Sequence, residues 1–173
     1  MTADFEFQPT LVGPSITLRP LRASDFDALH SAASDARIWE QHPDPLRYQR
    51  EVFREKFFNG GRDSGSAFVV VENASGRMIG SSRYYEWDPA KREVAIGYTF
   101  LARDHWGGTT NREMKDLMLK HAFRWADLVW LHIGMENVRS QRAAEKIGAV
   151  FSHAGEKEIN GSLQKYVFYK IHK

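Results

Sequence analysis

The chain has 173 residues, which suits one domain and is too short for two ordinary domains with separate cores. Its 24 basic and 22 acidic residues give a formal charge of +2, and because the basic residues are scattered we expect no nucleic-acid partner. The absence of cysteine excludes disulfides, thiolate metal sites and a cysteine nucleophile. We therefore expect one folded domain over residues 1–173, in which residues 1–14 form an N-terminal extension.

Membrane and metal binding are not expected either. No stretch of about 18 apolar residues occurs, and residues 1–12 contain acidic side chains and no apolar run of signal length. The seven histidines show no pair or acidic cluster at the spacing of metal ligands. The sequence thus predicts a cytoplasmic protein without a membrane segment or a metal site.

One strand and two helices open the chain. Residues 15–22 alternate polar and apolar side chains, as a half-buried strand does. Ser24 is expected to cap a short helix, and Asp44 a second helix that ends at Gly60 and Gly61. Two helices would then precede the main sheet.

Three strand-like runs follow, at residues 66–74, 77–87 and 92–102, and turn residues between them indicate an antiparallel meander. Apolar residues at helical spacing predict a long helix over 110–125.

The last part of the chain begins with a buried-strand pattern at 128–135. Asn137 is expected to cap a helix that ends at Gly148, and two strands flank a turn at Asn160 and Gly161. The whole order is typical of an α+β domain with a mixed, mostly antiparallel sheet of about seven strands.

A glycine pair stands immediately before the long helix. Because the first N–H groups of a helix lack partners and the helix dipole adds positive charge, Gly107 and Gly108 indicate a site for a pyrophosphate. Thr110 and Glu113 match a capping box at this helix start. The alternative is that the glycines only turn the chain.

Three separated segments resemble one family. They are residues 15–26, the loop from Trp106 to Asn111, and the pair of runs at 137–140 and 145–149. Together they resemble the GNAT superfamily, the Gcn5-related N-acetyltransferases, and within it the ribosomal-protein N-terminal acetyltransferases. The resemblance covers nearly the whole chain and implies a GNAT-like fold, with helices on both faces of the sheet and a splay between its fourth and fifth strands.

The resemblance also implies where acetyl-CoA would bind. The strand at 93–101 would splay from that at 128–135, and the pantetheine arm would lie in the gap. The pyrophosphate would contact the loop made by Trp106, Gly107, Gly108, Thr109, Thr110 and Asn111. Thr109 and Asn111 replace small residues of the family pattern. A backbone N–H around Phe100, Leu101 or Ala102 would stabilise the oxyanion, and Asn137 and Ser140 would also contact coenzyme A.

A thioester is electrophilic enough for direct attack by a neutral amine, so no covalent enzyme intermediate is needed. Many family members protonate the leaving thiolate with a tyrosine at the position that Ala144 occupies here. Ser140 is the candidate acid in its place; its alternative is a buried polar residue of the first helical turn. Glu86 and Glu93 are candidate bases that act through water, or else solvated carboxylates at strand ends.

The family places loops over the entrance for the acceptor, and Trp39, Gln41, His42 and Trp87 fall in those loops. The leading hypothesis is an acetyltransferase that acts on a protein or peptide N-terminal amine. A small amine such as a polyamine, amino acid or aminoglycoside is the second, which acidic loops near the entrance would favour. A sensor that binds acyl-CoA without turnover is the third, and a homodimer through the aromatic-rich last strands is an open possibility.

Overall fold

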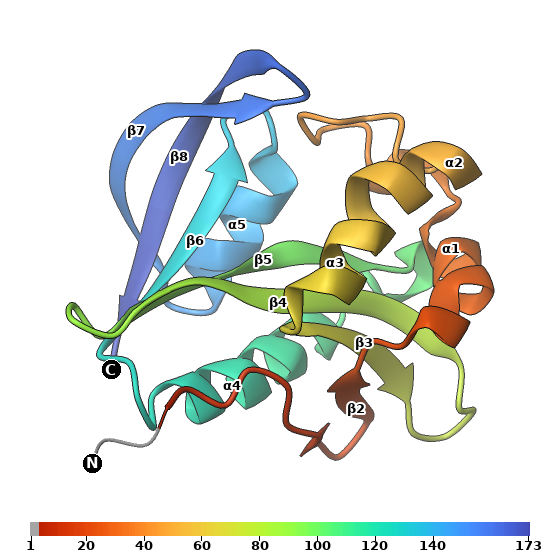
Figure 1. The fold of residues 1–173 in the computed structure, drawn as a ribbon, viewed down its shortest axis with the longest axis horizontal. Coiled ribbons are helices and arrows are strands. Elements are labelled where there is room, and N and C mark those ends of the chain that lie inside the picture. Colours follow the sequence, from red (N-terminus) through yellow and green to blue (C-terminus); the bar gives the residue numbers. More distant parts are fainter. Residues whose placement is uncertain (1–3) are drawn as a thin grey trace.

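The structure is a computed structural model that describes residues 4–173. Its strands are β1 Leu11–Val12, β2 Ile16–Pro20, β3 Ala67–Glu72, β4 Met78–Asp88, β5 Glu93–Leu101, β6 Leu128–Gly134, β7 Val150–Ile159 and β8 Ser162–His172. Its α-helices are α1 Phe26–Ala33, α2 Arg50–Phe53, α3 Asn59–Ser64, α4 Thr110–Ala122 and α5 Val138–Lys146 (Figure 1).

All eight strands form one sheet, in the order β1-β2-β3-β4-β5-β6-β8-β7. Every neighbouring pair is antiparallel except β5 and β6, which run parallel. The sheet has one strand more than predicted, because Leu11–Val12 pairs with Leu18 and Thr17 of β2. Part of the expected N-terminal extension is therefore an edge strand of the sheet.

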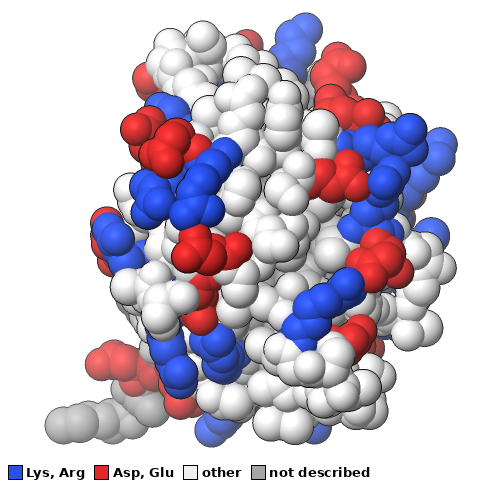
Figure 2. All heavy atoms as spheres, turned by 90° about the vertical axis from the view of Figure 1, so that its right-hand side faces the viewer, with Lys and Arg blue, Asp and Glu red and all other residues white. Residues whose placement is uncertain are grey.

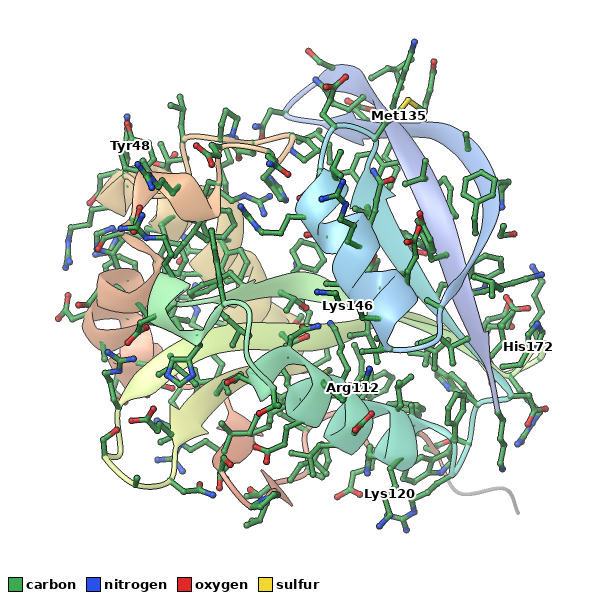
Figure 3. The ribbon with its side chains drawn as sticks, turned by 180° about the vertical axis from the view of Figure 1, so that it is seen from behind. Tyr48, Arg112, Lys120, Met135, Lys146 and His172 are labelled. Carbon is green, nitrogen blue, oxygen red and sulfur yellow. The ribbon has the colours of Figure 1, made fainter. Side chains whose placement is uncertain are left out.

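Helices cover both faces of the sheet, as predicted. The helices α1, α2 and α3 lie on one face, and α4 and α5 lie on the other (Figures 1 and 3). Successive residues of β3 enter opposite cores: Phe68 and Val70 pack with Met118 of α4, whereas Val69 packs with Leu29 of α1. A strand that is buried on both faces reads as a continuous apolar run, which is what β3 shows.

The beginnings of the first two helices differ from prediction. Ser24 does not cap a helix, because the Asp25 carboxylate accepts the Arg22 N–H at 2.7 Å and starts a 3₁₀ turn earlier. Asp44 does not cap the next helix either. It accepts hydrogen bonds from Arg47 and Asn160, and α2 begins only at Arg50.

The second helical region also ends later than predicted. It runs through a π-helical segment, Arg54–Phe58, into α3, so that Gly60 and Gly61 lie inside a helix. The helix ends at Gly65, which has a left-handed φ of 67°. The prediction that Gly60 and Gly61 end this helix is therefore wrong, and Gly65 is the glycine at its C-terminus.

A gap opens between β5 and β6. The two strands pair only from Glu93 to Ala95, and beyond these residues β6 continues beside β8 while β5 continues beside β4. The splay expected between strands 93–101 and 128–135 is therefore present. Beyond the paired residues, the facing backbone edges of β5 and β6 are open to a ligand in the gap.

The remaining features of the molecule concern its surface. Within residues 4–173 no helix is long and apolar enough to span a membrane. Figure 2 shows positive and negative side chains interspersed on the face that carries α1 and α2, without a stripe of one sign. On the edge strand β7, Val150 and Phe151 are more than half exposed. The homodimer stays a prediction.

Candidate active site

A pocket of about 190 Å³ passes through the gap between β5 and β6. Its walls are residues 96–99 of β5 and residues 131–134 of β6. The helices α4 and α5 close the pocket on one face of the sheet, and we call this side the α5 half. Its lining residues are Asn111, Lys115, Asn137, Ser140, Ala143, Ala144 and Ile147. On the other face lies the α3 half, lined by Trp39, His42, Arg47, Phe57, Tyr85, Tyr98, His132, Lys157, Ile159 and Tyr166.

The alternation of side chains along the strands explains this division. In β6, Leu131 and Ile133 belong to the core beneath α4 and α5, so His132 between them faces the other side. In β4, Tyr84 lies in that same core, and Tyr85 therefore faces the α3 half. The pocket thus connects the two faces of the sheet through the gap.

The loop before α4 turns at Gly107, whose φ is +72°. A side chain added at Gly108 would meet nothing within 4 Å, so the backbone here is open to a ligand. Trp106 folds back, and its indole N–H donates to the Leu101 carbonyl at 3.0 Å. Only Asn111 of this predicted loop lines the pocket itself.

The predicted capping box at α4 is wrong. Thr109 is the N-cap and makes no side-chain cap bond, while Thr110 bonds to His105 Nδ1 at 3.0 Å. The Glu113 carboxylate accepts the N–H of Ser15, far away in the sequence, at 3.1 Å. The first amides of α4 are therefore left without a side-chain cap, which is the state an anion needs.

The residues predicted for the oxyanion lie beyond the pocket. Phe100 and Leu101 are paired in register with Ser81 and Gly80, and the Ala102 N–H donates to the Ile79 carbonyl at 2.7 Å. Ala102 therefore has no free N–H for an oxyanion. None of the three residues lines the pocket.

Unpaired backbone groups of β5 lie instead at a bulge just before the three residues predicted for the oxyanion. The pairing with β4 shifts between Gly97 and Phe100, so that neither Tyr98 nor Thr99 has a paired residue in β4 or β6. Tyr98 has a φ of +50°, an uncommon value for a bulky residue. The bulge directs backbone groups of β5 away from the ladder, at the pocket wall.

Asn137 and Ser140 lie together at the start of α5. Asn137 caps α5, and its Oδ1 accepts the N–H of Ser140 at 3.3 Å. Both residues line the α5 half of the pocket, beside Ala144. The cap holds the first turn of α5 against the gap.

Lys115 was missed by the sequence analysis. Its side chain is buried in the α5 half, and Nζ donates to Thr99 Oγ1 at 3.0 Å. Burial lowers the pKa of this amine to about 7. A signal was available, because Lys115 stands within the buried stripe of α4 that includes Met114, Met118 and Leu119.

Two of the four predicted acceptor residues line the α3 half. Trp39 is buried, and its indole donates to the Ala33 carbonyl at 2.9 Å. His42 Nδ1 accepts the Asp44 N–H at 2.9 Å. Burial, and then the charge of Arg47, lower the His42 pKa to about 3, so this ring is neutral.

The other two acceptor residues do not line the pocket. The Gln41 side chain accepts the Arg139 N–H at 3.1 Å and is turned toward α5. Trp87 packs on Phe5 in the opposite core, with ring centroids 5.0 Å apart. A register shift between Tyr85 and Asp88, with Glu86 at a φ of +53°, reverses the alternation of β4 and moves Trp87 to that face.

The two predicted carboxylates also stand outside the pocket. Glu93 accepts the Trp130 indole N–H at 3.0 Å, at the end where β5 and β6 still pair. Glu86 is exposed, and its carboxylate lies 3.9 Å from His132 Nε2. No Asp or Glu lines the pocket within residues 4–173.

Instead, two cationic side chains line the α3 half, and a third, Arg83, packs on its Tyr98. Lys157 Nζ donates to His132 Nδ1 at 3.0 Å and lies 5.4 Å from the centre of the Tyr85 ring. Burial, followed by the charge of Lys157, lowers the His132 pKa to about 4, which keeps the ring neutral. Arg47 lines the same half. The Arg83 guanidinium stacks on the Tyr98 ring, and within residues 4–173 the buried Nε of Arg83 has no hydrogen-bond partner.

No group of three or more potential metal ligands occurs in the part of the chain that the structure describes. The family model for the acetyltransferase (GNAT) domain matches residues 15–150. The chain belongs to the GNAT acetyltransferase family. It is accordingly an acyltransferase with the fold predicted from its sequence.

Solved structures share this fold at low sequence identity. A GCN5-related N-acetyltransferase from Brucella melitensis is 21% identical, with a TM-score of 0.83 over 98% of this chain and 80% of that one. A protein of Vibrio cholerae described as a ribosomal-protein-serine acetyltransferase is 15% identical, with a TM-score of 0.80 over 96% and 99%. The microcin self-immunity acetyltransferase MccE, solved with acetyl-CoA and AMP, is 14% identical, with a TM-score of 0.75 over 98% and 100%. No curated protein matches the chain by sequence.

Proposed function

We propose that this GNAT protein transfers acetyl from acetyl-CoA directly to a primary amine, within a ternary complex. The observation that carries the proposal is the pocket that passes through the gap between β5 and β6. A donor that enters from the α5 half and an acceptor that enters from the α3 half would meet inside the gap. Two reactants held in this way need no covalent enzyme intermediate.

The uncapped start of α4 supports the position of the donor. Its free amides and the open backbone at Gly107 and Gly108 suit the pyrophosphate, with Thr109, Thr110 and Asn111 beside it. The pantetheine arm would then follow the gap toward Asn137. MccE, which shares the fold, was solved with acetyl-CoA bound.

The chemistry requires an oxyanion donor and an acid. The neutral amine nitrogen forms a bond to the thioester carbon and becomes positively charged, while the carbonyl oxygen becomes negative. The C–S bond then breaks to release a thiolate, and the nitrogen gives up its extra proton to form the amide, which balances the proton that the thiolate takes up. We assign the oxyanion to a backbone N–H at the bulge of Tyr98 and Thr99. Ser140 is our candidate for protonating the thiolate, and Lys115 is the second donor on the same side of the gap.

The incoming ammonium must lose a proton before it attacks. A site lined by cations disfavours the charged form of a bound amine and so lowers its pKa. Glu86 is the predicted base nearer to the α3 half and would receive the proton through water at the surface. Glu93 is held by Trp130 where the strands are still paired, so we assign it no proton transfer.

For the acceptor we propose a protein or peptide N-terminus, with a small amine as the alternative. Polyamines and aminoglycosides fit poorly, because the pocket lining has cations where acidic residues would be needed. Thiol release from acetyl-CoA, measured over a panel of peptides and small amines, tests the proposal. Release with one class of acceptor identifies the substrate, whereas binding of acetyl-CoA without release over the whole panel would support the sensor.

A further inference from the structure

The α3 half of the pocket has a charge that does not suit an ordinary amine. Arg47 and Lys157 line it, both histidines on its wall are neutral, and no carboxylate faces it within residues 4–173. A protonated amine that carried no other charge would be repelled as it entered. An anionic group on the acceptor would offset this repulsion beyond what the Asp44 ion pair of Arg47 already does.

Arg47 is held by a buried ion pair with Asp44, which offsets part of its charge but bonds only to Nε. Its Nε bonds to Asp44 Oδ2 at 3.3 Å, and the same carboxylate oxygen accepts from Asn160 Nδ2 at the β7–β8 turn. The guanidinium lies 5.8 Å from the Trp39 ring centre and 5.7 Å from that of Phe57. Aromatic walls and the Asp44 bond therefore fix the fork, and its two terminal nitrogens remain for a ligand.

Contacts with His132 and Tyr166 hold Lys157 in place. His132 Nδ1 accepts a hydrogen bond from its ammonium, which places the proton of the neutral ring on Nε2, toward Glu86. Glu86 is largely exposed, so its charge is screened by water. The Lys157 ammonium also lies 5.5 Å from the Tyr166 ring centre, and Tyr166 faces the charge of Arg47 as well. Both cations thus lie near one tyrosine.

The phosphates of coenzyme A do not account for these cations. The start of α4, where a pyrophosphate would bind, lies on the opposite face of the sheet from the loop of Arg47 and from Lys157. The donor side has a buried amine of its own, Lys115.

We propose that the acceptor carries an anionic group, a carboxylate or a phosphate, close to the amine that is acetylated, and that Arg47 and Lys157 bind this group. The inference rests on the proposed acetyl transfer and narrows its substrate class. In a peptide the anion is an acidic side chain beside the N-terminus; in a small molecule it is a carboxylate or phosphate on the amine's own skeleton. An anion bound here also offsets the repulsion that the ammonium meets.

The test uses pairs of acceptors that differ only in charge. The pairs are a peptide with Asp at its second position and the same peptide with Asn, an amino acid and its amide, and an amino alcohol with and without a phosphate ester. The full-length protein is assayed with each, by thiol release from acetyl-CoA. We expect the anionic member of at least one pair to have a kcat/KM at least tenfold higher, and the pair concerned distinguishes the sources of the anion.

Two lysine variants make the assignment specific. Lys157→Gln should reduce the preference for the anionic member to less than threefold, mainly through KM. Lys165→Gln removes an exposed lysine from the same hairpin and should keep the preference. Preference for the uncharged members, or an anionic preference that Lys157→Gln leaves intact, would overturn the inference without affecting acetyl transfer.

Failure of the proposed function would look different. If no acceptor releases thiol, acetyl transfer to amines is refuted, and calorimetry with the N-acetylated amino acid and its amide still decides the charge of the site. Tighter binding of the carboxylate, abolished by Lys157→Gln, would uphold the anion site. Equal binding of the two would overturn it.

Discussion

At the scale of single residues, Lys115 is buried although lysines are almost always exposed. It is buried beside Thr99, and burial lowers its pKa from 10.5 to about 7. Between these values the unfolded chain binds more protons than the folded one, so the stability of the folded protein rises with pH. Below pH 7 both states are protonated and this contribution is constant.

The Lys115→Met variant should therefore lack a slope that the unaltered protein has. From pH 7 to 9, without acetyl-CoA, the free energy of unfolding should rise more steeply in the unaltered protein, by up to about 1.4 kcal/mol for each pH unit. Denaturant titrations at several pH values measure the slopes. Lys165→Met, at an exposed position, should retain the slope; equal slopes in all three proteins would mean that Lys115 is not buried as described.

Ser140 allows a second residue-scale prediction. If its hydroxyl protonates the leaving thiolate, Ser140→Ala should lower kcat by about 10² or more while the Kd for acetyl-CoA changes little. Stopped-flow thiol release and calorimetry measure the two quantities. An unchanged kcat would remove Ser140 from the mechanism and leave Lys115 as the donor.

At the scale of elements, the start of α4 combines a free helix end with an open loop. Thr109→Asp would place a negative charge among the amides that we assign to the pyrophosphate. The Kd for acetyl-CoA should rise at least tenfold, while the stability of the protein does not fall, because an acidic residue suits a helix start. Gln49→Asp adds the same charge at the start of α2, which also lacks a side-chain cap, and should leave the Kd unchanged.

An unchanged Kd in Thr109→Asp would contradict the assignment of the loop. A loss of stability together with affinity would show instead that the variant damages the helix. Chemical denaturation of both variants separates these outcomes.

The elements also show what the sequence could and could not predict. Strands with strong apolar alternation, the Asn137 cap and the Asn160–Gly161 turn were all predicted, because each is specified by neighbours in the sequence. The capping box failed because Glu113 bonds to Ser15 across 98 positions. Contacts of such length leave no local pattern.

Bulges account for other differences between the expected and the observed positions of residues at the site. One bulge in β4 moved Trp87 to the far face, and one in β5 placed the unpaired backbone at Tyr98 and Thr99, before the predicted Phe100 to Ala102. In a strand, a shift of one residue reverses the side that each residue faces. The family resemblance located the splay between the strands, but only the register of the sheet located the atoms that line it.

At the scale of the whole molecule, one core joins both parts of the splayed sheet. Met118 of α4 is fully buried in a cluster that includes Val94 of β5 and Val167 of β8. Met118→Ala should lower the free energy of unfolding by about 2–5 kcal/mol. Because the cluster spans the gap, unfolding should remain a single transition.

Leu163→Ala is the control for this prediction, since Leu163 is 69% exposed. Its effect should stay within about 0.5 kcal/mol. Two separate transitions in Met118→Ala would show that the two sides of the gap are independent, which would weaken the view of the gap as a rigid binding site.

The pocket that crosses the sheet is the feature on which the whole account depends. Our proposal is that acetyl-CoA and an amine bind at once, on opposite faces, and react in the gap between β5 and β6. Steady-state thiol release, with both substrates varied and the product identified by mass spectrometry, tests this most directly. We predict intersecting kinetics and a product that carries one added acetyl group, with no acetylated protein intermediate. Parallel kinetics with an acetylated form of the protein, or no binding of acetyl-CoA, would contradict the account.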